Sequence, residues 1–345
     1  MIIALDAMGG DTAPQSTVEG AILAAKYFVK QQMDVKILLV GMERILIQEM
    51  LQYQNKYDVA SLNIEILNAT EVIEMGEHPA NAVRKKKDSS LSVSARVVAD
   101  GKADAFVTMG NSGAAMATAL FYLKRIEGVL RPAISTPFPT SSGFCIIADA
   151  GANMDCKPEH LYQFAIMADS YSKAVMGIEN PRVGLVSIGE EETKGNELTL
   201  AASKLLKKAD LNFIGNIEGR DIAKGEADVV VCDGFVGNVI LKFGEGLAEM
   251  MLRSVKKGFK DHPIAWASIP FLWLAIRDLM KKVDYSEMGG VPLLGVNGVC
   301  IIGHGRSNSK AVKNALIAGA NAVKFNFINS IEEALKRSPL ELKKE

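Results

Sequence analysis

The strongest structural signal is Ile2-Ile3-Ala4-Leu5-Asp6-Ala7-Met8-Gly9-Gly10-Asp11, an apolar run that ends at two glycines between carboxylates. The run predicts a buried strand, and the glycines allow backbone N–H groups to approach a ligand closely. Pro14 is suited to the first turn of a following helix, whose positive end would face the same ligand. We therefore expect an anion or a polar substrate at this turn. The alternative is an ordinary tight turn in which Asp11 or Thr12 only caps the helix.

Similar apolar runs recur along the chain and alternate with helical patterns. The strand-like runs span residues 36–40, 64–67, 105–109, 144–148, 182–188, 229–232 and 299–302. Helical patterns lie between them at 15–32, 114–126, 159–175, 198–208, 239–257 and 310–325. Strands that are apolar on both faces belong in a parallel sheet covered by helices on both sides. The sequence therefore predicts an α/β fold, a three-layer, doubly wound, mostly parallel sheet in a single catalytic domain over residues 1–335 with a central cleft.

The composition limits the class of protein. The chain has 345 residues, 48% of them hydrophobic, which is enough to bury a large core. Lys and Arg total 39 against 40 Asp and Glu, so the overall charge gives no reason to expect a nucleic acid partner. The cysteines have no CxxC spacing, which favours a reduced cytoplasmic protein without a zinc site. The N-terminus lacks the pattern of a signal peptide, and no uncharged apolar stretch reaches the ~18 residues of a membrane span.

Polar, glycine-containing loops follow most of the predicted strands. They span residues 110–113, 149–153, 189–196, 233–238 and 303–308, in addition to the first turn. Open α/β sheets bind their ligands at the carboxyl ends of strands, so these loops predict a lined cleft. The cleft candidates, to which the sequence assigns no individual roles, are Asp6, Gly9, Gly10, Asp11, Asn111, Ser112, Asn153, Asp233 and His304. For His304, ligand binding and simple loop packing are alternatives.

Several catalytic motifs are absent from the sequence. No GxGxxG fingerprint follows a predicted strand, and the chain has neither the GxxxxGK[ST] loop of NTPases nor a GxSxG elbow. No histidine is followed five positions later by aspartate, as the histidine–aspartate glycerolipid acyltransferases require. Cys232 could be imagined as a thiol nucleophile, but a cysteine that ends a buried strand usually behaves as a small hydrophobic residue. We therefore expect no metal and no cofactor.

Taken together, the loop motifs resemble those of the bacterial phosphate acyltransferase of phospholipid synthesis. They are IALDAMGGD (3–11), FVTMGNSGA (106–114), ADAGAN (148–153), SIGEEETKGNE (187–197), VVVCDGFVGNV (229–239) and GVNGVCIIGHGRSN (295–308). The resemblance implies that a long-chain acyl group passes from the thioester of acyl carrier protein to inorganic phosphate. The acyl phosphate then feeds a membrane-bound glycerol-3-phosphate acyltransferase. The resemblance also implies a homodimer and a fold like that of isocitrate and isopropylmalate dehydrogenases and phosphate acetyltransferases.

The same resemblance implies two catalytic residues, Lys194 in ETKGNE and Asn238 in GFVGNV. Phosphate is already nucleophilic near neutral pH, so its attack on a thioester needs an anion pocket rather than a serine or a metal. We assign Lys194 to holding phosphate and offsetting developing charge, and Asn238 to orienting phosphate or donating to the thioester oxyanion. The alternatives are a solvated Lys194 that balances the glutamates at 190–192, and an Asn238 that caps a helix.

A helical hairpin insertion is predicted over residues 253–288. Its tip, residues 264–276, is uncharged and contains Trp266, Phe271 and Trp273, while residues 253–282 carry seven basic and two acidic side chains. Basic flanks around an aromatic tip are typical of an interfacial membrane contact, and the tip is too short to span a bilayer. We therefore expect a cytoplasmic protein attached peripherally to the inner face of the cell membrane. The alternatives are a dimer contact, a core-facing helix pair or a docking surface for the acidic carrier protein.

The sequence leaves other functions open. A phosphate acetyltransferase that uses short acyl-CoA would not need the aromatic, basic tip. A decarboxylating dehydrogenase on the same fold would need a nicotinamide cofactor and a metal, for which Asp149, Asp155 and Asp233 are the available carboxylates. A membrane-docked scaffold for lipid synthesis would tolerate the replacement of Lys194 and Asn238.

Overall fold

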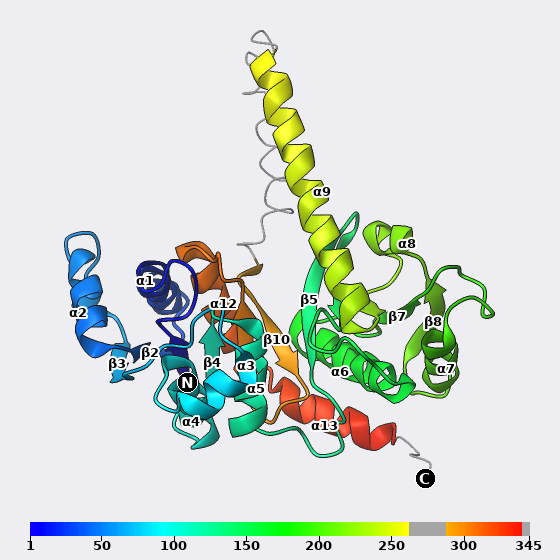
Figure 1. Cartoon of the computed structure of the whole chain (residues 1–345), viewed down its shortest axis with the longest axis horizontal. Coiled ribbons are helices and arrows are strands. Elements are labelled where there is room, and N and C mark those ends of the chain that lie inside the picture. Colours follow the sequence, from blue (N-terminus) through cyan, green and yellow to red (C-terminus); the bar gives the residue numbers. More distant parts are fainter. Residues whose placement is uncertain (262–287, 340–345) are drawn as a thin grey trace.

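The apolar runs form the strands of one 11-stranded sheet in the computed structural model, which describes residues 1–261 and 288–339 (Figure 1). The strands are β1 (Ile2–Asp6), β2 (Lys36–Gly41), β3 (Ile64–Asn68), β4 (Ala105–Thr108), β5 (Ala133–Thr140), β6 (Gly143–Ala148), β7 (Arg182–Val186), β8 (Asn212–Ile217), β9 (Val229–Val231), β10 (Gly290–Leu294) and β11 (Val299–Gly303). The α-helices are α1 (Gln15–Lys30), α2 (Glu43–Gln52), α3 (Pro79–Lys85), α4 (Ser90–Ala99), α5 (Ser112–Tyr122), α6 (Pro158–Met176), α7 (Glu197–Leu206), α8 (Gly219–Lys224), α9 (Gly234–Asp261), α12 (Ser309–Lys324) and α13 (Phe327–Arg337).

The sheet consists of two parallel halves that run in opposite directions. Its strand order is β3-β2-β1-β4-β11-β10-β5-β6-β9-β7-β8. In this order, the first five strands, β3, β2, β1, β4 and β11, are parallel to one another. The last four, β6, β9, β7 and β8, are also parallel to one another. Between them, β10 is antiparallel to β11 and β5, and β5 is antiparallel to β6. The predicted α/β fold with a mostly parallel sheet is confirmed. The reversal of strand direction at its centre was not predicted from the sequence.

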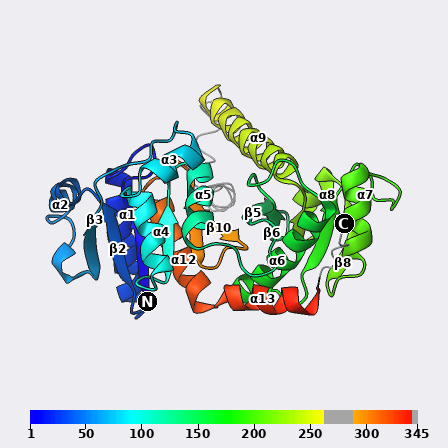
Figure 2. The ribbon, with the colours of Figure 1, turned by 60° about the horizontal axis from the view of Figure 1, so that its bottom comes forward.

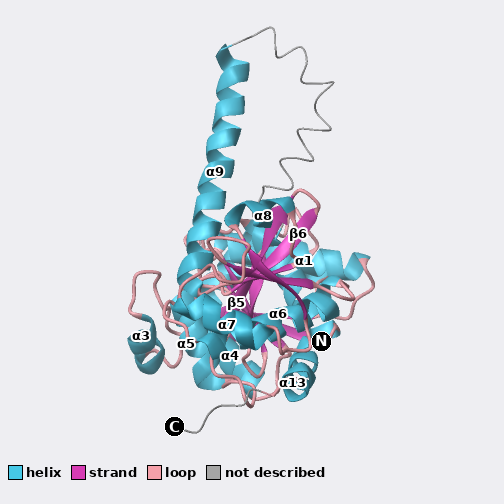
Figure 3. Cartoon of the chain, turned by 90° about the vertical axis from the view of Figure 1, so that its right-hand side faces the viewer, coloured by secondary structure: helices cyan, strands magenta, loops and turns pink. Residues whose placement is uncertain are grey.

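Helices cover both faces of the sheet (Figure 3). Alternate residues of a strand point to opposite faces, so Ile3 and Leu5 join one buried cluster while Ala4 joins another. The first cluster lies under α1, α6, α7, α12 and α13 and contains residues of both halves, including Phe28 and Phe164. On the opposite face, α4 and α5 cover the first half of the sheet, whereas α8 and the base of α9 cover the second half.

The helix α13 connects the two halves along one side of the molecule (Figure 2). It follows α12 of the first half and packs on α6 of the second. Phe327 of α13 is buried and meets Tyr171 of α6 edge to face, with ring centroids 5.6 Å apart. Beyond the helix, the hydroxyl of Tyr162 donates to the carbonyl oxygen of Ser338 at 3.3 Å. This contact adds a second link between the halves besides the sheet itself.

The strands β5, β8 and β10 do not appear among the predicted apolar runs. Each carries residues that are unfavourable in central strands, Pro137 and Pro139 in β5, Gly215 in β8 and Pro292 in β10. β10 pairs with β5 only at residues 133 and 134, so within the described residues the segment that holds both β5 prolines pairs on one side alone. A strand that is paired on one side tolerates proline, because the missing N–H is not needed for a hydrogen bond to a second neighbouring strand.

The far part of the helix α9 projects from the rest of the described molecule, while its base packs on the second half of the sheet (Figure 1). It begins earlier than predicted, at Gly234, and it ends at Asp261, within the segment 253–288 for which a hairpin is predicted. The tip with Trp266, Phe271 and Trp273 lies outside the described residues. Within residues 1–261 and 288–339, no helix is long and apolar enough to cross a membrane.

Replacement of Gly20 by alanine is expected to destabilise the protein, although alanine favours a helix by about 1 kcal/mol. A Cβ at Gly20 of α1 would lie 2.6 Å from Cγ1 of Val312 in α12, and closer still to its Cβ. Overpacking costs about 1–3 kcal/mol, so we expect a lower free energy of unfolding in guanidinium denaturation. Gly319→Ala in α12 is the control, because its Cβ would meet Val107 at an ordinary 3.4 Å. Equal stability of the two variants would contradict the close α1–α12 contact.

Candidate functional site

The turn after β1 lies against the loops that follow β4 and β11. The backbone N–H of Asp11 donates to the carbonyl oxygen of Gly305 at 2.8 Å. Gly10 has a φ of +107°, a conformation that glycine adopts readily, and a Cβ there would lie 3.3 Å from the same oxygen. A Cβ at Gly9 would lie 3.0 Å from the backbone nitrogen of Gly110. We call this group the first-half cluster; it contains Asp6, Gly9, Gly10, Asp11, Asn111, Ser112 and His304.

Some members of the first-half cluster have structural partners. Asn111 Oδ1 accepts the N–H of Ala114 at 3.0 Å and so caps α5, while its Nδ2 donates to the carbonyl oxygen of Met75 at 2.8 Å. The helix α1 has no side-chain cap, so the alternative in which Asp11 or Thr12 caps it is wrong. The members with exposed side chains are Asp11, Ser112 and His304.

Asp6 is the buried carboxylate of the first-half cluster, with 2% of the residue exposed. Its Oδ2 accepts the hydroxyl of Thr108 at 2.7 Å, and Thr108 Oγ1 accepts the N–H of Gly110 at 3.0 Å. Burial raises the pKa of Asp6, against hydrogen bonds from Ser90 and Thr108 that act in the opposite direction. Asp6 therefore lies beneath the exposed turn and ties it to the loop after β4.

Asp149, directly after β6, is a fully buried carboxylate that organises the second half. Its Oδ1 accepts the N–H groups of Ile134 at 3.0 Å and Ala152 at 3.1 Å. Its Oδ2 accepts the N–H of Asn153 at 2.6 Å and the side-chain Nδ2 of Asn153 at 2.9 Å. Burial raises the pKa of Asp149, while these hydrogen bonds lower it. In the sequence, the only sign of this role is its position between a buried strand and Gly151.

The helix α9 begins in contact with the loop that Asp149 holds. The N–H of Gly234 donates to the carbonyl oxygen of Asn153 at 2.7 Å. A Cβ at Gly234 would lie 2.7 Å from that oxygen, and a Cβ at Gly237 would overlap the carbonyl oxygen of Asp149. Glycine at both positions permits this close approach. Asn153, a predicted cleft residue, is 4% exposed, so its side chain supports the loop from the protein interior.

Asn238 lies within α9 and has an exposed side chain. The residue that caps the helix is Asp233, whose Oδ1 accepts the N–H of Val236 at 2.9 Å. The alternative in which Asn238 is a capping residue is therefore wrong. A Cβ at Gly151 would lie 3.7 Å from the Cβ of Asn238, so Asn238 is next to the exposed Gly151 of the 149–153 loop.

Lys194 lies in the loop between β7 and α7, and the neighbouring strand β8 holds the backbone of this loop. The carbonyl oxygen of Lys194 accepts the Ser187 hydroxyl at 3.1 Å and Asn216 Nδ2 at 3.3 Å. The same Nδ2 donates to the carbonyl oxygen of Glu191 at 3.0 Å. The Lys194 side chain is exposed. The sequence showed no sign of this role of Asn216, because it depends on the pairing of β7 with β8.

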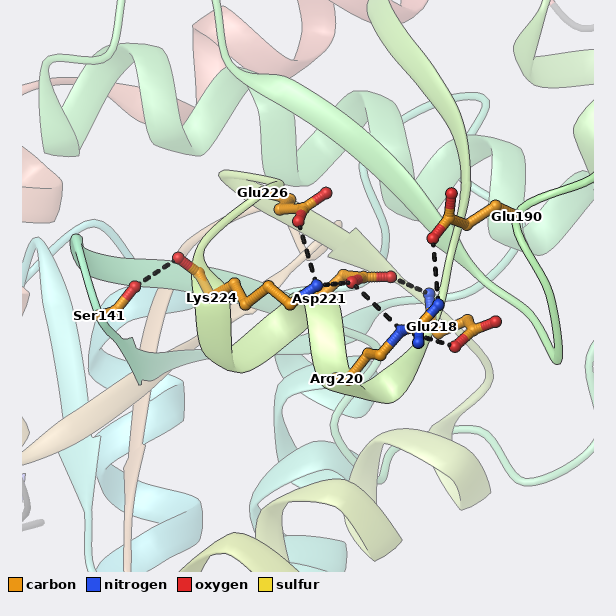
Figure 4. Close-up of polar contacts among 7 residues, drawn as sticks. All are labelled: Ser141, Glu190, Glu218, Arg220, Asp221, Lys224 and Glu226. Atoms are coloured by element: carbon orange, nitrogen blue, oxygen red, sulfur yellow. Dashed lines mark hydrogen bonds and ion pairs between the residues drawn. The ribbon is translucent and has the colours of Figure 1, made fainter.

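Two glutamates of this loop pair with cations other than Lys194. Glu190 pairs with Arg220 of α8 at 3.4 Å (Figure 4), and Glu192 pairs with Lys207 at the end of α7. Lys194 has no ion pair with any residue that the structure describes. Glu190 and Glu192 are therefore balanced by these two cations rather than by Lys194.

Three neighbouring strands supply one group of exposed polar atoms. β7 and β9 are adjacent and parallel, and so are β9 and β6, so the loops that follow them leave the same edge of the sheet. We call Lys194 and Gly151 on these loops, together with Asn238 in the first turns of α9, the second-half site. A cation, a side-chain amide and a backbone N–H such as that of Gly151 are the kinds of donor that bind anions in proteins. The candidate residues thus form two groups, one in each half of the sheet.

Cys232 does not have the environment of a nucleophile. It is 3% exposed at the end of β9, and its Sγ donates to the carbonyl oxygen of Asp149 at 3.6 Å. Burial, together with the charges of Asp233 and Asp149, raises the pKa of the thiol well above its usual value. The thiol therefore stays protonated near neutral pH, as expected for a structural cysteine.

Comparisons with known proteins identify relatives along almost the entire chain. A family model described as "Fatty acid synthesis protein" matches residues 1–330. The chain is 71% identical over 337 residues to a phosphate acyltransferase of Endomicrobium trichonymphae, covering 98% of each chain. It is 49% identical to a phosphate acyltransferase of Pelotomaculum thermopropionicum, covering 97% of this chain and 95% of that one. These findings confirm the family resemblance carried by the loop motifs.

Solved structures of two enzyme classes share the fold. A phosphotransacetylase from Staphylococcus aureus matches with a TM-score of 0.59 and 17% identity, covering 94% of each chain. A 4-hydroxythreonine-4-phosphate dehydrogenase from Salmonella typhimurium matches with a TM-score of 0.54 and 12% identity, covering 93% of this chain and 98% of that one. At this identity the likeness concerns the fold alone, and it agrees with the expected dehydrogenase-like architecture.

Asp149→Asn is expected to lower the free energy of unfolding by about 2–4 kcal/mol, since its amide would face two buried N–H donors without an acceptor. Guanidinium denaturation measures this change. Asp104→Asn is the matched control, because Asp104 is exposed and accepts only the N–H of Ile2, which asparagine can also do. We expect the control to change stability by less than about 1 kcal/mol. Equal stability of both variants would contradict the organising role of Asp149.

Proposed function

This chain belongs to the family of fatty acid synthesis proteins, and on that premise we propose that it transfers a long-chain acyl group from acyl carrier protein to inorganic phosphate. Relatives at 71% and 49% identity are named phosphate acyltransferase, which supports acyl transfer to phosphate. The observation that carries the proposal is the position of Lys194 and Asn238 on the segments that follow two adjacent parallel strands, β7 and β9. The acyl phosphate would then serve phospholipid synthesis as the donor for a membrane-bound glycerol-3-phosphate acyltransferase.

In the proposed reaction, a phosphate oxygen attacks the carbonyl carbon of the thioester. The new O–C bond forms, a tetrahedral oxyanion collapses, and the C–S bond breaks. The thiolate takes up a proton, so the products are acyl phosphate and free carrier protein. This route requires an oriented phosphate and donors for the oxyanion, and it involves no covalent enzyme intermediate.

The second-half site offers donors for both requirements. Lys194 would bind phosphate and offset the charge that develops on it, because Glu190 and Glu192 are already paired with other cations. Asn238 would orient phosphate or donate its amide N–H to the oxyanion, beside the backbone of Gly151. The hydrogen bonds from Ser187 and Asn216 would keep Lys194 in place during the reaction.

The helix α9 supports two further parts of the proposal, a homodimer and a peripheral membrane contact. Apolar side chains recur along its exposed surface at intervals of three or four residues, at Val239, Phe243, Leu247 and Met250. Phe243 is 70% exposed, and such a stripe on a projecting helix calls for a covering surface. A second copy of α9 would cover it, and the aromatic, basic segment beyond Asp261 would then reach the membrane.

Lys194→Ala and Asn238→Ala are each expected to lower the rate of thiol release from palmitoyl acyl carrier protein by roughly a hundredfold to a thousandfold. The wild type should release thiol only when phosphate is present. Lys208→Ala is the control, since it removes an exposed lysine just beyond the other end of α7 and should leave the rate unchanged. Free thiol is measured with a chromogenic disulfide.

Other results would redirect the assignment. Thiol release from acetyl-CoA but not from the palmitoyl carrier would favour a short-chain phosphate acetyltransferase. Unchanged rates in both alanine variants would remove Lys194 and Asn238 from the mechanism. No reaction with any thioester would favour a scaffold or a dehydrogenase.

A further inference from the structure

A group of unpaired cations lies at the end of the short helix α3. Its last residues, Arg84 and Lys85, and the nearby Lys87 are exposed. None of the three side chains has a hydrogen bond or ion pair with any residue that the structure describes. Lys86 differs from them, because its Nζ donates to the carbonyl oxygen of Val72 at 2.7 Å and pairs with Glu77. We call Arg84, Lys85 and Lys87 the α3 cationic surface.

The carboxylates near this surface are occupied by other groups. Asp88 accepts the N–H of Thr70 at 3.0 Å and its hydroxyl at 2.6 Å. These bonds and the charge of Arg96 lower the pKa of Asp88. Glu77 accepts the N–H of Glu74 at 2.8 Å in addition to its contact with Lys86. These carboxylates hold the local backbone, so the three exposed cations remain available to a partner.

The helix that carries the α3 cationic surface begins beside the first-half cluster. Asn111 Nδ2 donates to the carbonyl oxygens of Met75 and Glu77, just before α3. A Cβ at Gly113 would lie 2.8 Å from Cγ of Pro79, the first residue of α3, so α3 and α5 are in close contact there (Figure 2). The cations lie at the other end of this seven-residue helix, about 10 Å away, so a protein bound by them would extend toward the loop that follows β4.

We propose that the α3 cationic surface docks the acidic protein that carries the acyl thioester. This inference rests on the proposed function and assigns a different surface to each task. The apolar stripe of α9 and the basic segment beyond it would serve self-association and the membrane, whereas α3 would hold the donor protein beside the first-half cluster. Exposed cations that complement an acidic protein increase the rate of encounter and fix its orientation.

The test uses the triple variant Arg84→Gln, Lys85→Gln, Lys87→Gln in the full chain. Its KM for palmitoyl acyl carrier protein is expected to rise roughly tenfold, with kcat unchanged. The wild-type kcat/KM should fall as salt rises from about 50 to about 300 mM, and this dependence should weaken in the variant. A neutral substrate, decanoyl N-acetylcysteamine with phosphate, should react equally with both proteins. The control variant Lys30→Gln, Lys204→Gln, Lys208→Gln makes the same change of charge elsewhere and should behave as wild type.

Three results would overturn the docking surface. They are an unchanged KM and salt dependence in the triple variant, an equal loss in the control variant, and an equal loss with the neutral thioester. Calorimetric titration with holo acyl carrier protein separates this proposal from the reaction itself, because it needs no turnover. If no thioester reacts, weaker carrier binding by the triple variant but not by the control variant still supports docking at the α3 cationic surface. Equal binding by the wild type and the triple variant refutes it.

Discussion

The buried carboxylate of Asp149 is the interaction on which the second half of the molecule depends. It accepts N–H groups from the start of β5 and from its own loop, so it fixes the place where these segments meet. The helix α9 then packs on this loop through Gly234 and Gly237, whose missing side chains allow backbone contact. Asn238 follows directly, so its position results from one carboxylate and two glycines rather than from local helix preference.

The reversal of strand direction at β10 and β5 explains why the candidate residues fall into two groups. In the second half, the parallel neighbours β7 and β9 bring the loop with Lys194 and the start of α9 with Asn238 to one edge of the sheet. In the first half, β1, β4 and β11 assemble a glycine-rich turn supported by the buried Asp6. Under our proposals the second half binds phosphate and the first half receives the acyl carrier. The central strands β10 and β5 connect these two halves of the sheet.

The sequence predicts those elements that are determined by residues close to one another in the chain. Strands that are apolar on both faces, and the polar loops after them, follow from hydrophobic pattern and turn chemistry. The prolines of β5 and β10 conceal these strands, because their pairing depends on distant partners. The same limit applies to the site. The sequence identifies Lys194 and Asn238 only through family resemblance, and the supporting bonds of Asp149 and Asn216 come from neighbouring strands that no local pattern reveals.

In the proposed reaction phosphate, rather than water, accepts the acyl group. Phosphorus NMR of the wild-type protein with palmitoyl acyl carrier protein and inorganic phosphate distinguishes the two acceptors. We expect an acyl phosphate resonance that grows in step with the release of carrier thiol. Release of thiol without any loss of the inorganic phosphate signal would instead identify a thioester hydrolase.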